Sequence, residues 1–345
     1  MPRTNLSAHA RTLFVLAALL LFCAQAAQAA PQTFVSAKGD DANPCAHASP
    51  CRTFAGALAK TDFGGELAVL DSGEYGPVTI NYSVKITAVG VFAGITAFDA
   101  DAVTVKPSSG AVVALRGLTL TGQGGAHGIY YDGPGAARAG DPKEPSATLH
   151  VENCTISGFT VNGIYFYGNG SLLVKDTTVR NNDVYAIELT APADEKVRAA
   201  IVNSRLEGNH AGLFAHSDDL IEVTVRDTVA ANNQGTGFAA TSEGVRMQLQ
   251  NCVSANQHAG VSAAQGARVT VEGCALTNSK YGIYVTKEGV ARVSGTTVTD
   301  NEVGVANLDF NGVVTYGHVY TFGNNRVFGN KQETEGKPSL IVKQF

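Results

Sequence analysis

The sequence predicts an all-β chain wound as a single-stranded parallel β-helix. A motif recurs every 22 to 25 residues over 223–301. Each copy alternates apolar with polar residues, which is typical of strands, and each contains a turn with Asn or Asp. A repeat of this length holds three short strands, and stacked repeats form coils in which each coil pairs only with its neighbours.

Three apolar columns appear when the repeats are aligned. The first column contains Val174, Ile201, Val225, Leu249, Val271 and Val293. The second contains Ile156, Val179, Leu206, Leu276 and Val298. The third contains Ile129, Ile164, Ile187, Leu213, Phe238, Val261, Ile283 and Val305. Three columns predict three strands per coil, each with one face turned into the core.

The turns predict ladders of asparagine side chains. Asn tolerates a left-handed backbone and bonds to its own turn, and stacked copies can bond to one another along the axis. One repeat position holds Asn232, Asn256, Asn278 and Asp300, and the next holds Asn182, Asn209, Asn233 and Asn301. We expect these residues to serve the fold rather than a ligand.

Residues 1–29 are expected to be a signal peptide that is removed on export. Arg3 and Arg11 precede an apolar run too short to anchor in a membrane, and a small-x-small cleavage motif ends at Ala29. Without this leader, 23 basic residues face 30 acidic ones, and no basic run occurs. We therefore expect a secreted or periplasmic location, no membrane insertion and no nucleic-acid partner.

Residues 30–64 are expected to form a strand, a polar loop and a short helix. Phe54, Ala57 and Leu58 fall on one face of the helix predicted over 52–60. The first coil of a solenoid has an open apolar end that must be covered. This helix is therefore the predicted N-terminal cap.

The β-helix is expected to have about ten coils over 65–330. An insertion at 132–147 and a smaller one at 191–197 predict surface loops, and such loops often form a binding rim. Residues 331–345 are expected to be a polar tail and a closing strand.

Export favours a disulfide between Cys45 and Cys51, which flank a short polar loop. Cys154, Cys252 and Cys274 each lie two residues before the second apolar column or its equivalent, where a small buried thiol is expected. A bond between Cys252 and Cys274 stays open, although reduced thiols are favoured.

No cofactor is expected. The cysteine spacing does not indicate zinc. Asp40 and Asp41 follow Gly39, and this pair predicts a turn, since a calcium loop needs further ligands at regular spacing. Calcium stays an alternative without a supporting motif.

The repeats over 112–330 resemble the right-handed parallel β-helix (pectate-lyase-like) superfamily, which includes pectate lyases, polygalacturonases and alginate epimerases. The start, FVSAKGDDANPC…PCRTFAGAL, is similar to that of secreted bacterial β-helix repeat proteins of undefined role. The resemblance implies a right-handed winding. It does not extend to the paired acids, the aligned calcium-binding Asp residues or the Asp-Pro-His motif of those enzymes.

Outward side chains beside the third column form the candidate site. Aromatic rings next to carboxylates and amides suit sugars, because a ring covers an apolar sugar face and polar groups bond its hydroxyls. The expected ligand-binding residues are Tyr130, Tyr165, Tyr167, Asn162, Phe214 and Tyr284. The weaker candidates for catalysis are Asp183, Glu188, His210 and His216.

Three functions stay open. The first is binding of a polysaccharide along the side of the β-helix, near the insertion at 132–147. The second is a polysaccharide lyase or glycoside hydrolase with an unfamiliar active site. The third is a structural or adhesive protein of the cell envelope, although about ten coils at roughly 4.8 Å each make a rod that is short for a spacer.

Overall fold

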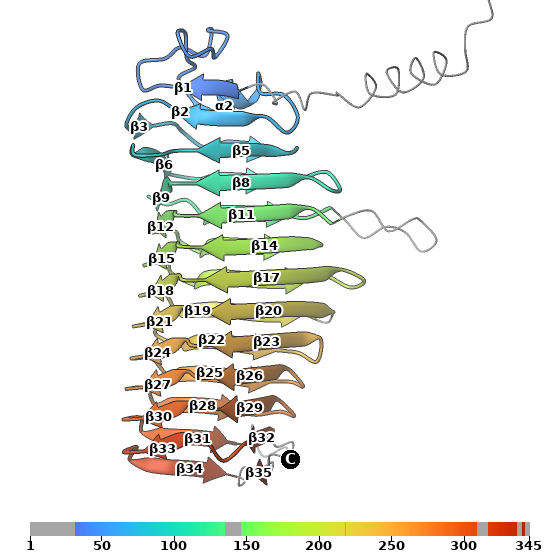
Figure 1. Ribbon diagram of the computed structural model, residues 1–345, viewed down its shortest axis with the longest axis vertical. Coiled ribbons are helices and arrows are strands. Elements are labelled where there is room, and N and C mark those ends of the chain that lie inside the picture. Colours follow the sequence, from blue (N-terminus) through green and yellow to red (C-terminus); the bar gives the residue numbers. More distant parts are fainter. Residues whose placement is uncertain (1–31, 135–145, 218, 309–316, 337–339, 342–345) are drawn as a thin grey trace, which may run out of the picture.

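The computed structural model describes residues 32–134, 146–217, 219–308, 317–336 and 340–341. Its strands form three parallel sheets, and within each sheet the strands stack along one straight axis (Figure 1). We call these sheets 1, 2 and 3, in the order in which each coil visits them. The predicted signal peptide and most of the insertion at 132–147 lie outside the described residues.

The strands of each sheet follow in order along the axis. Sheet 1 has 13 strands: β1 (Gln32–Val35), β2 (Glu66–Val69), β5 (Val84–Thr87), β8 (Val112–Arg116), β11 (Thr148–Glu152), β14 (Gly170–Lys175), β17 (Lys196–Val202), β20 (Leu220–Arg226), β23 (Val245–Gln250), β26 (Arg268–Glu272), β29 (Val290–Ser294), β32 (His318–Thr321) and β35 (Leu340–Ile341). Sheet 2 has 11 strands: β3 (Gly73–Glu74), β6 (Ala93–Ala97), β9 (Leu118–Gly122), β12 (Thr155–Ser157), β15 (Thr178–Arg180), β18 (Arg205–Glu207), β21 (Val229–Ala231), β24 (Val253–Ala255), β27 (Ala275–Thr277), β30 (Thr297–Thr299) and β33 (Arg326–Phe328). Sheet 3 has 11 strands: β4 (Val78–Ile80), β7 (Val103–Val105), β10 (His127–Asp132), β13 (Asn162–Tyr167), β16 (Tyr185–Ala191), β19 (Ala211–Ser217), β22 (Thr236–Thr241), β25 (Ala259–Ala264), β28 (Tyr281–Val285), β31 (Val303–Asn307) and β34 (Gln332–Gly336).

Within the residues that the structure describes, eleven triplets of strands, from β2–β3–β4 to β32–β33–β34, make the successive coils. The predicted right-handed parallel β-helix of about ten coils is confirmed. The three predicted apolar columns are confirmed as well. In sheet 3, for example, Ile164 pairs in register with Ile187, and Ile187 pairs with Leu213. These three side chains are fully buried.

A small residue precedes each member of the third column because side chains of sheet 2 approach closely there. A Cβ atom at Gly163 would lie 2.2 Å from Cγ1 of Val179 in sheet 2. That distance is far below a van der Waals contact, so a side chain at Gly163 would push the two sheets apart. The recurring Gly or Ala thus belongs to the fold.

The predicted asparagine ladders are confirmed at both turn positions. In the buried ladder, Nδ2 of Asn182 donates to Oδ1 of Asn209 at 2.9 Å, and Nδ2 of Asn209 donates to Asn233 at 3.2 Å. In the exposed ladder, Asn256 donates to Asn232 at 3.1 Å. Asn232 and Asn256 have φ values of 56° and 58°, which is the left-handed region that Asn tolerates.

A short helix, α2 (Phe54–Leu58), lies at the N-terminal end of the stack, beside β1 and β2 (Figure 1). Its Phe54 and Ala57 are fully buried. The side chain of Asp41 stabilises the loop before α2. Its Oδ1 accepts hydrogen bonds from the backbone N–H groups of Arg52 and Thr53 at 2.8 and 2.9 Å. Asp41 therefore holds the turn in place, as expected for Asp40 and Asp41.

The predicted disulfide between Cys45 and Cys51 is confirmed, with 4.7 Å between the two Cα atoms. Cys154, Cys252 and Cys274 are free and buried. They belong to a column of small side chains that accept backbone N–H groups from the preceding coil. The Sγ of Cys274, for example, accepts from the N–H of Cys252 at 3.4 Å.

The C-terminal coil ends with two strands. Residues 332–336, within the predicted polar tail, form β34, which pairs with β31. The final strand β35 pairs with β32. No helix among the described residues has the length and hydropathy required to cross a bilayer.

Candidate ligand-binding site on sheet 3

The outer face of sheet 3 gathers aromatic and polar side chains on four adjacent strands, β10, β13, β16 and β19. Cross-strand pairing aligns two outward columns. The first column is Tyr130, Tyr165, Glu188 and Phe214, and the second is Asp132, Tyr167, Thr190 and His216. Neighbouring strands lie about 4.8 Å apart, so members of one column contact each other although 23 to 35 residues separate them in sequence.

Four rings form a continuous aromatic surface at one end of the site. Tyr130 and Tyr165 stack with their centroids 5.6 Å apart. His127 lies 5.7 Å from Tyr130 and 5.3 Å from Tyr165, and Tyr167 lies 6.0 Å from Tyr165. These separations are in the range of favourable ring contacts. The rings therefore form one continuous patch, with interplanar angles of 22° to 52° between neighbouring rings.

Glu188 is the centre of a hydrogen-bond network beside that patch. Its Oε2 accepts from Nδ2 of Asn162 at 2.6 Å, and its Oε1 lies 2.9 Å from Nε2 of His216. The same His216 nitrogen lies 3.0 Å from the hydroxyl oxygen of Thr190. A carboxylate only accepts hydrogen bonds, so Nε2 of His216 carries the proton that points to Glu188. The side chain of Glu188 is 15% exposed and that of His216 is 37% exposed.

Asn162 orients the Glu188 carboxylate from its buried side. It is fully buried, and its Oδ1 accepts the backbone N–H of Tyr185 at 3.1 Å while its Nδ2 donates to Glu188. Both the oxygen and the nitrogen of the Asn162 amide are thus hydrogen-bonded. Because the amide cannot turn without losing both bonds, Glu188 is held in one direction.

A second aromatic group lies on the C-terminal side of Glu188. Phe214 stacks on Tyr185 and on His216, with centroids 4.8 Å apart in each pair. His216 is therefore fixed on one side by a ring and on another by the Glu188 carboxylate. The carboxylate sits between the two aromatic groups.

Burial shapes the electrostatics of the site. It lowers the pKa of His127, although the nearby carboxylates of Asp101 and Glu188 act in the opposite direction. Burial also raises the pKa of Tyr165, and the charge of Glu188 adds to that effect. At neutral pH, His127 is therefore an uncharged imidazole and Tyr165 an uncharged phenol. The strands of sheet 3 contain no Lys or Arg.

The structure brings together most of the residues expected from the sequence. Tyr130, Tyr165, Tyr167, Asn162, Glu188, Phe214 and His216 all lie in this cluster. Asp183 and His210 do not: both are exposed in the turns before β16 and β19, and their side chains make no hydrogen bond or ion pair within the described part of the chain. Tyr284 lies in register with Phe214 but three strands away, beyond Ala239 and Ser262.

Sequence reasoning missed Tyr185 and Thr190 as members of the site. His127 and Tyr185 flank Asn162 at the same register position of sheet 3, two residues before Ile129 and Ile187. Asp183 lies four residues before Ile187, so it falls outside the strand. Counting back two residues from each member of the third column would have identified Tyr185.

Comparison with known proteins places the chain in a family. A model of the family described as periplasmic copper-binding protein (NosD) matches residues 152–342, which is more than half of the chain. The chain belongs to the NosD family. No curated protein matches it.

Solved structures share the β-helix fold with this NosD-family chain at low identity. The periplasmic alginate epimerase AlgG is 12% identical with a TM-score of 0.55, over 81% of this chain and 77% of that one. The A-module of the Azotobacter vinelandii mannuronan C-5 epimerase AlgE4 is 14% identical with a TM-score of 0.51, over 82% and 91%. XylC in complex with xylose is 10% identical with a TM-score of 0.53, over 86% and 70%. These likenesses show the fold alone.

The described residues do not fit the copper site that the NosD family description implies. No group of three or more His, Cys, Asp and Glu side chains that could hold a metal occurs among the residues that the structure describes. Glu188 and His216 are only a pair, and the free thiols are buried in the core. Burial raises the pKa of Cys154 to about 11, which disfavours the thiolate that binds metal.

Proposed function

We propose that this NosD-family protein is exported and binds a polysaccharide on the outer face of sheet 3. The aromatic patch of Tyr130, Tyr165, Tyr167 and His127 beside the fixed carboxylate of Glu188 carries the proposal. Flat rings cover the apolar faces of sugars, and a carboxylate accepts hydrogen bonds from sugar hydroxyls. The periplasmic description of the family and the predicted signal peptide support export.

The geometry leaves acceptor capacity for a ligand. An ionised carboxylate has about four lone-pair sites, and Glu188 uses one on each oxygen, for Asn162 and for His216. The remaining sites belong to a side chain that is partly exposed between two aromatic groups. A sugar lying over Tyr165 would therefore meet a pre-oriented acceptor. The solved structures with the same fold include two alginate epimerases and a protein bound to xylose, which supports a carbohydrate ligand.

Affinity electrophoresis in gels that contain single polysaccharides tests this proposal. Tyr165→Ala is expected to weaken retention roughly tenfold, because a ring stacked on a ligand contributes on the order of 1 kcal/mol beyond its buried area. Glu188→Gln, which keeps the shape and removes the charge, is expected to weaken it further. Tyr320→Ala on sheet 1 is the matched control and should leave retention unchanged. Retention that is unaffected by the first two variants would refute the proposal.

The contact between Glu188 and His216 favours a second candidate, a lyase that removes a proton from a uronic-acid sugar. A hydrogen-bonded carboxylate and imidazole 2.9 Å apart form a unit that can accept and transfer a proton. Incubation with uronate polymers, with and without calcium, should then produce unsaturated sugar ends that absorb in the ultraviolet. Product formation that persists in Glu188→Gln and His216→Ala would exclude this role for the pair.

A further inference from the structure

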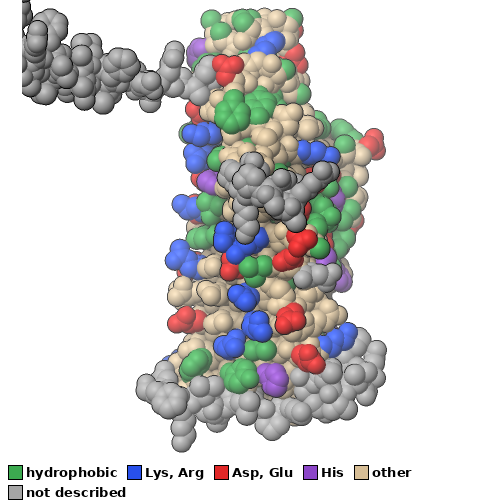
Figure 2. Space-filling view, turned by 90° about the vertical axis from the view of Figure 1, so that its right-hand side faces the viewer, with side chains coloured by type: hydrophobic (Ala, Val, Ile, Leu, Met, Phe, Trp, Pro, Cys, Tyr) green, Lys and Arg blue, Asp and Glu red, His purple; other side chains and the backbone are tan. Residues whose placement is uncertain are grey.

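The outer face of sheet 1 carries a concentration of basic side chains that sheet 3 lacks. Its six consecutive strands from β14 to β29 hold seven basic residues and two acidic ones. The whole chain, in contrast, is acidic, with 25 basic and 30 acidic residues. Figure 2 shows Lys and Arg side chains spread along much of the length of the molecule. The basic residues are Lys175, Lys196, Arg198, Arg226, Arg246, Arg268 and Arg292.

Strand register aligns four of the charged residues of sheet 1 in one column, which we call the arginine column: Arg198, Glu222, Arg246 and Arg268. Their strands are adjacent, so the side chains follow one another about every 4.8 Å along the axis. Glu222 forms ion pairs with Lys196 at 3.1 Å and with Arg198 at 3.2 Å, and these cations lower its pKa. The Glu222 carboxylate is thus already paired with two cations on the preceding strand.

Arg246 and Arg268 are different. They are direct cross-strand partners, and neither forms an ion pair within the described residues. Two like charges side by side on a sheet repel each other. Two guanidinium groups in this arrangement are therefore available to an external anion, and each can bind a carboxylate with two parallel hydrogen bonds.

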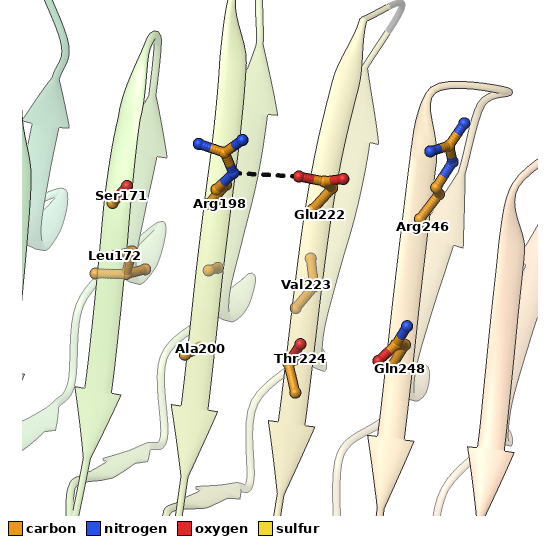
Figure 3. Close-up of a pocket in the computed structure, with 10 residues that line it drawn as sticks. Ser171, Leu172, Arg198, Ala200, Glu222, Val223, Thr224, Arg246 and Gln248 are labelled. Atoms are coloured by element: carbon orange, nitrogen blue, oxygen red, sulfur yellow. Dashed lines mark hydrogen bonds and ion pairs between the residues drawn. The ribbon is translucent and has the colours of Figure 1, made fainter. Parts of the chain in front are cut away.

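A second outward column runs parallel to the first, two residues further along each strand, and consists of Ala200, Thr224, Gln248 and Thr270. The small Ala200 leaves a shallow groove of about 580 Å³, lined by Arg198, Glu222 and Arg246 on one side and by Thr224 and Gln248 on the other. Figure 3 shows these residues projecting from successive strands. The arginine column, with its ion-paired Glu222, thus runs beside the hydroxyl and amide groups of Thr224, Gln248 and Thr270.

We propose that this groove on sheet 1 binds a linear polysaccharide that carries carboxylate groups and runs across the strands, along the axis. Arg246 in the groove and Arg268 on the next strand bind the carboxylates. Thr224 and Gln248 in the groove, together with Thr270 on the next strand, bind the sugar hydroxyls. Two adjacent arginines without ion-pair partners beside neutral polar groups match a polymer with an acid on each sugar. The arginine column and the column beside it hold no aromatic residue from β14 to β29, whereas single-stranded nucleic acid is usually held by rings that stack on its bases. This site is separate from sheet 3 and does not depend on the function proposed there.

Binding of polygalacturonate to the exported form of the protein tests the inference. The wild type is expected to bind polygalacturonate but not neutral dextran, and to bind less tightly as salt rises. The double variant Arg246→Ala/Arg268→Ala is expected to lose at least tenfold in affinity. A double replacement by Lys keeps the charge but loses the two-point hydrogen bonding, so it should recover only part of that loss.

The matched control is Arg180→Ala/Arg205→Ala, which removes two exposed arginines from sheet 2. An equal loss in both double variants would mean that only overall charge matters, and would overturn the inference. Tighter binding of single-stranded DNA, lost in the same sheet 1 variant, would overturn it in favour of nucleic acid. In gels of a polysaccharide without carboxylates, retention that Tyr165→Ala weakens should be unchanged in Arg246→Ala/Arg268→Ala, which separates this site from the one on sheet 3. Thermal melts of all variants confirm that they are folded, since the replaced side chains are on the surface.

Discussion

Replacing Asn162 by Ala should destabilise the protein by about 2 kcal/mol, because this buried amide satisfies two partners at once. The change leaves the backbone N–H of Tyr185 without its acceptor and Oε2 of Glu188 without its donor. An unsatisfied buried N–H costs about 1 to 3 kcal/mol. Glu188 is partly exposed, so water can replace the lost donor there and the second cost is small. The free energy of unfolding in urea measures the difference.

The matched control for this prediction is Thr236→Ala. Thr236 has the same register position in sheet 3, on β22, and its side chain makes no hydrogen bond within the described part of the chain. We expect a change of less than about 0.5 kcal/mol for this variant. Equal decreases in the free energy of unfolding for the two variants would show that the hydrogen bonds of Asn162 add nothing to stability and that Asn162 does not orient Glu188.

Three further predictions concern the core, the disulfide and pH. Phe238→Ala should cost about 3 to 5 kcal/mol because the ring is fully buried, whereas Val253→Ala, at an exposed position of sheet 2, should cost little; equal urea midpoints would contradict this. Reducing the Cys45–Cys51 bond should lower stability by about 2 kcal/mol, a value near the low end because the loop is short, and an unchanged melting temperature with dithiothreitol would refute it. Burial lowers the pKa of His127 in the folded protein below 6.5, its value in the unfolded chain. The unfolded chain therefore binds more protons than the folded protein as pH drops below 6.5, and the free energy of unfolding should decrease in that range. His127→Asn should remove this part of the pH dependence, and identical profiles would count against the burial effect.

The fold was predictable because its determinants recur in every coil. Inward residues such as Ile164, Ile187 and Leu213 must be apolar wherever they occur, since each fills the same position of the core. The same constraint acts on the turns, where Asn209 must accept from Asn182 and donate onward to Asn233. Recurrence of this kind is visible in one sequence without any comparison. This recurrence was enough to predict the register of the strands in all three sheets.

The site was only partly predictable because its residues differ from one coil to the next. Tyr165 and Glu188 were found because they follow members of an apolar column, and the strand period places such neighbours on the outer face. The hydrogen bond that joins Asn162 to Glu188 is diagonal, because the two residues are 26 positions apart whereas register partners on their strands are 23 apart. Asp183 and Glu188 are close in sequence, yet a corner separates them, so proximity along the chain was a poor guide to the cluster.

The two faces proposed for ligands arise from the same property of the β-helix. Inward positions are constrained by the core, whereas outward positions in adjacent coils are free to vary and are held about 4.8 Å apart by the sheet. On sheet 3 this spacing brings Tyr130, Tyr165 and Glu188 into one row, and on sheet 1 it does the same for Arg246 and Arg268. A ligand with its own regular repeat can meet several members of such a row at once. A scaffold that repeats along an axis is therefore suited to polymers, and two rows with different charge can select polymers of different chemistry on opposite sides of one core.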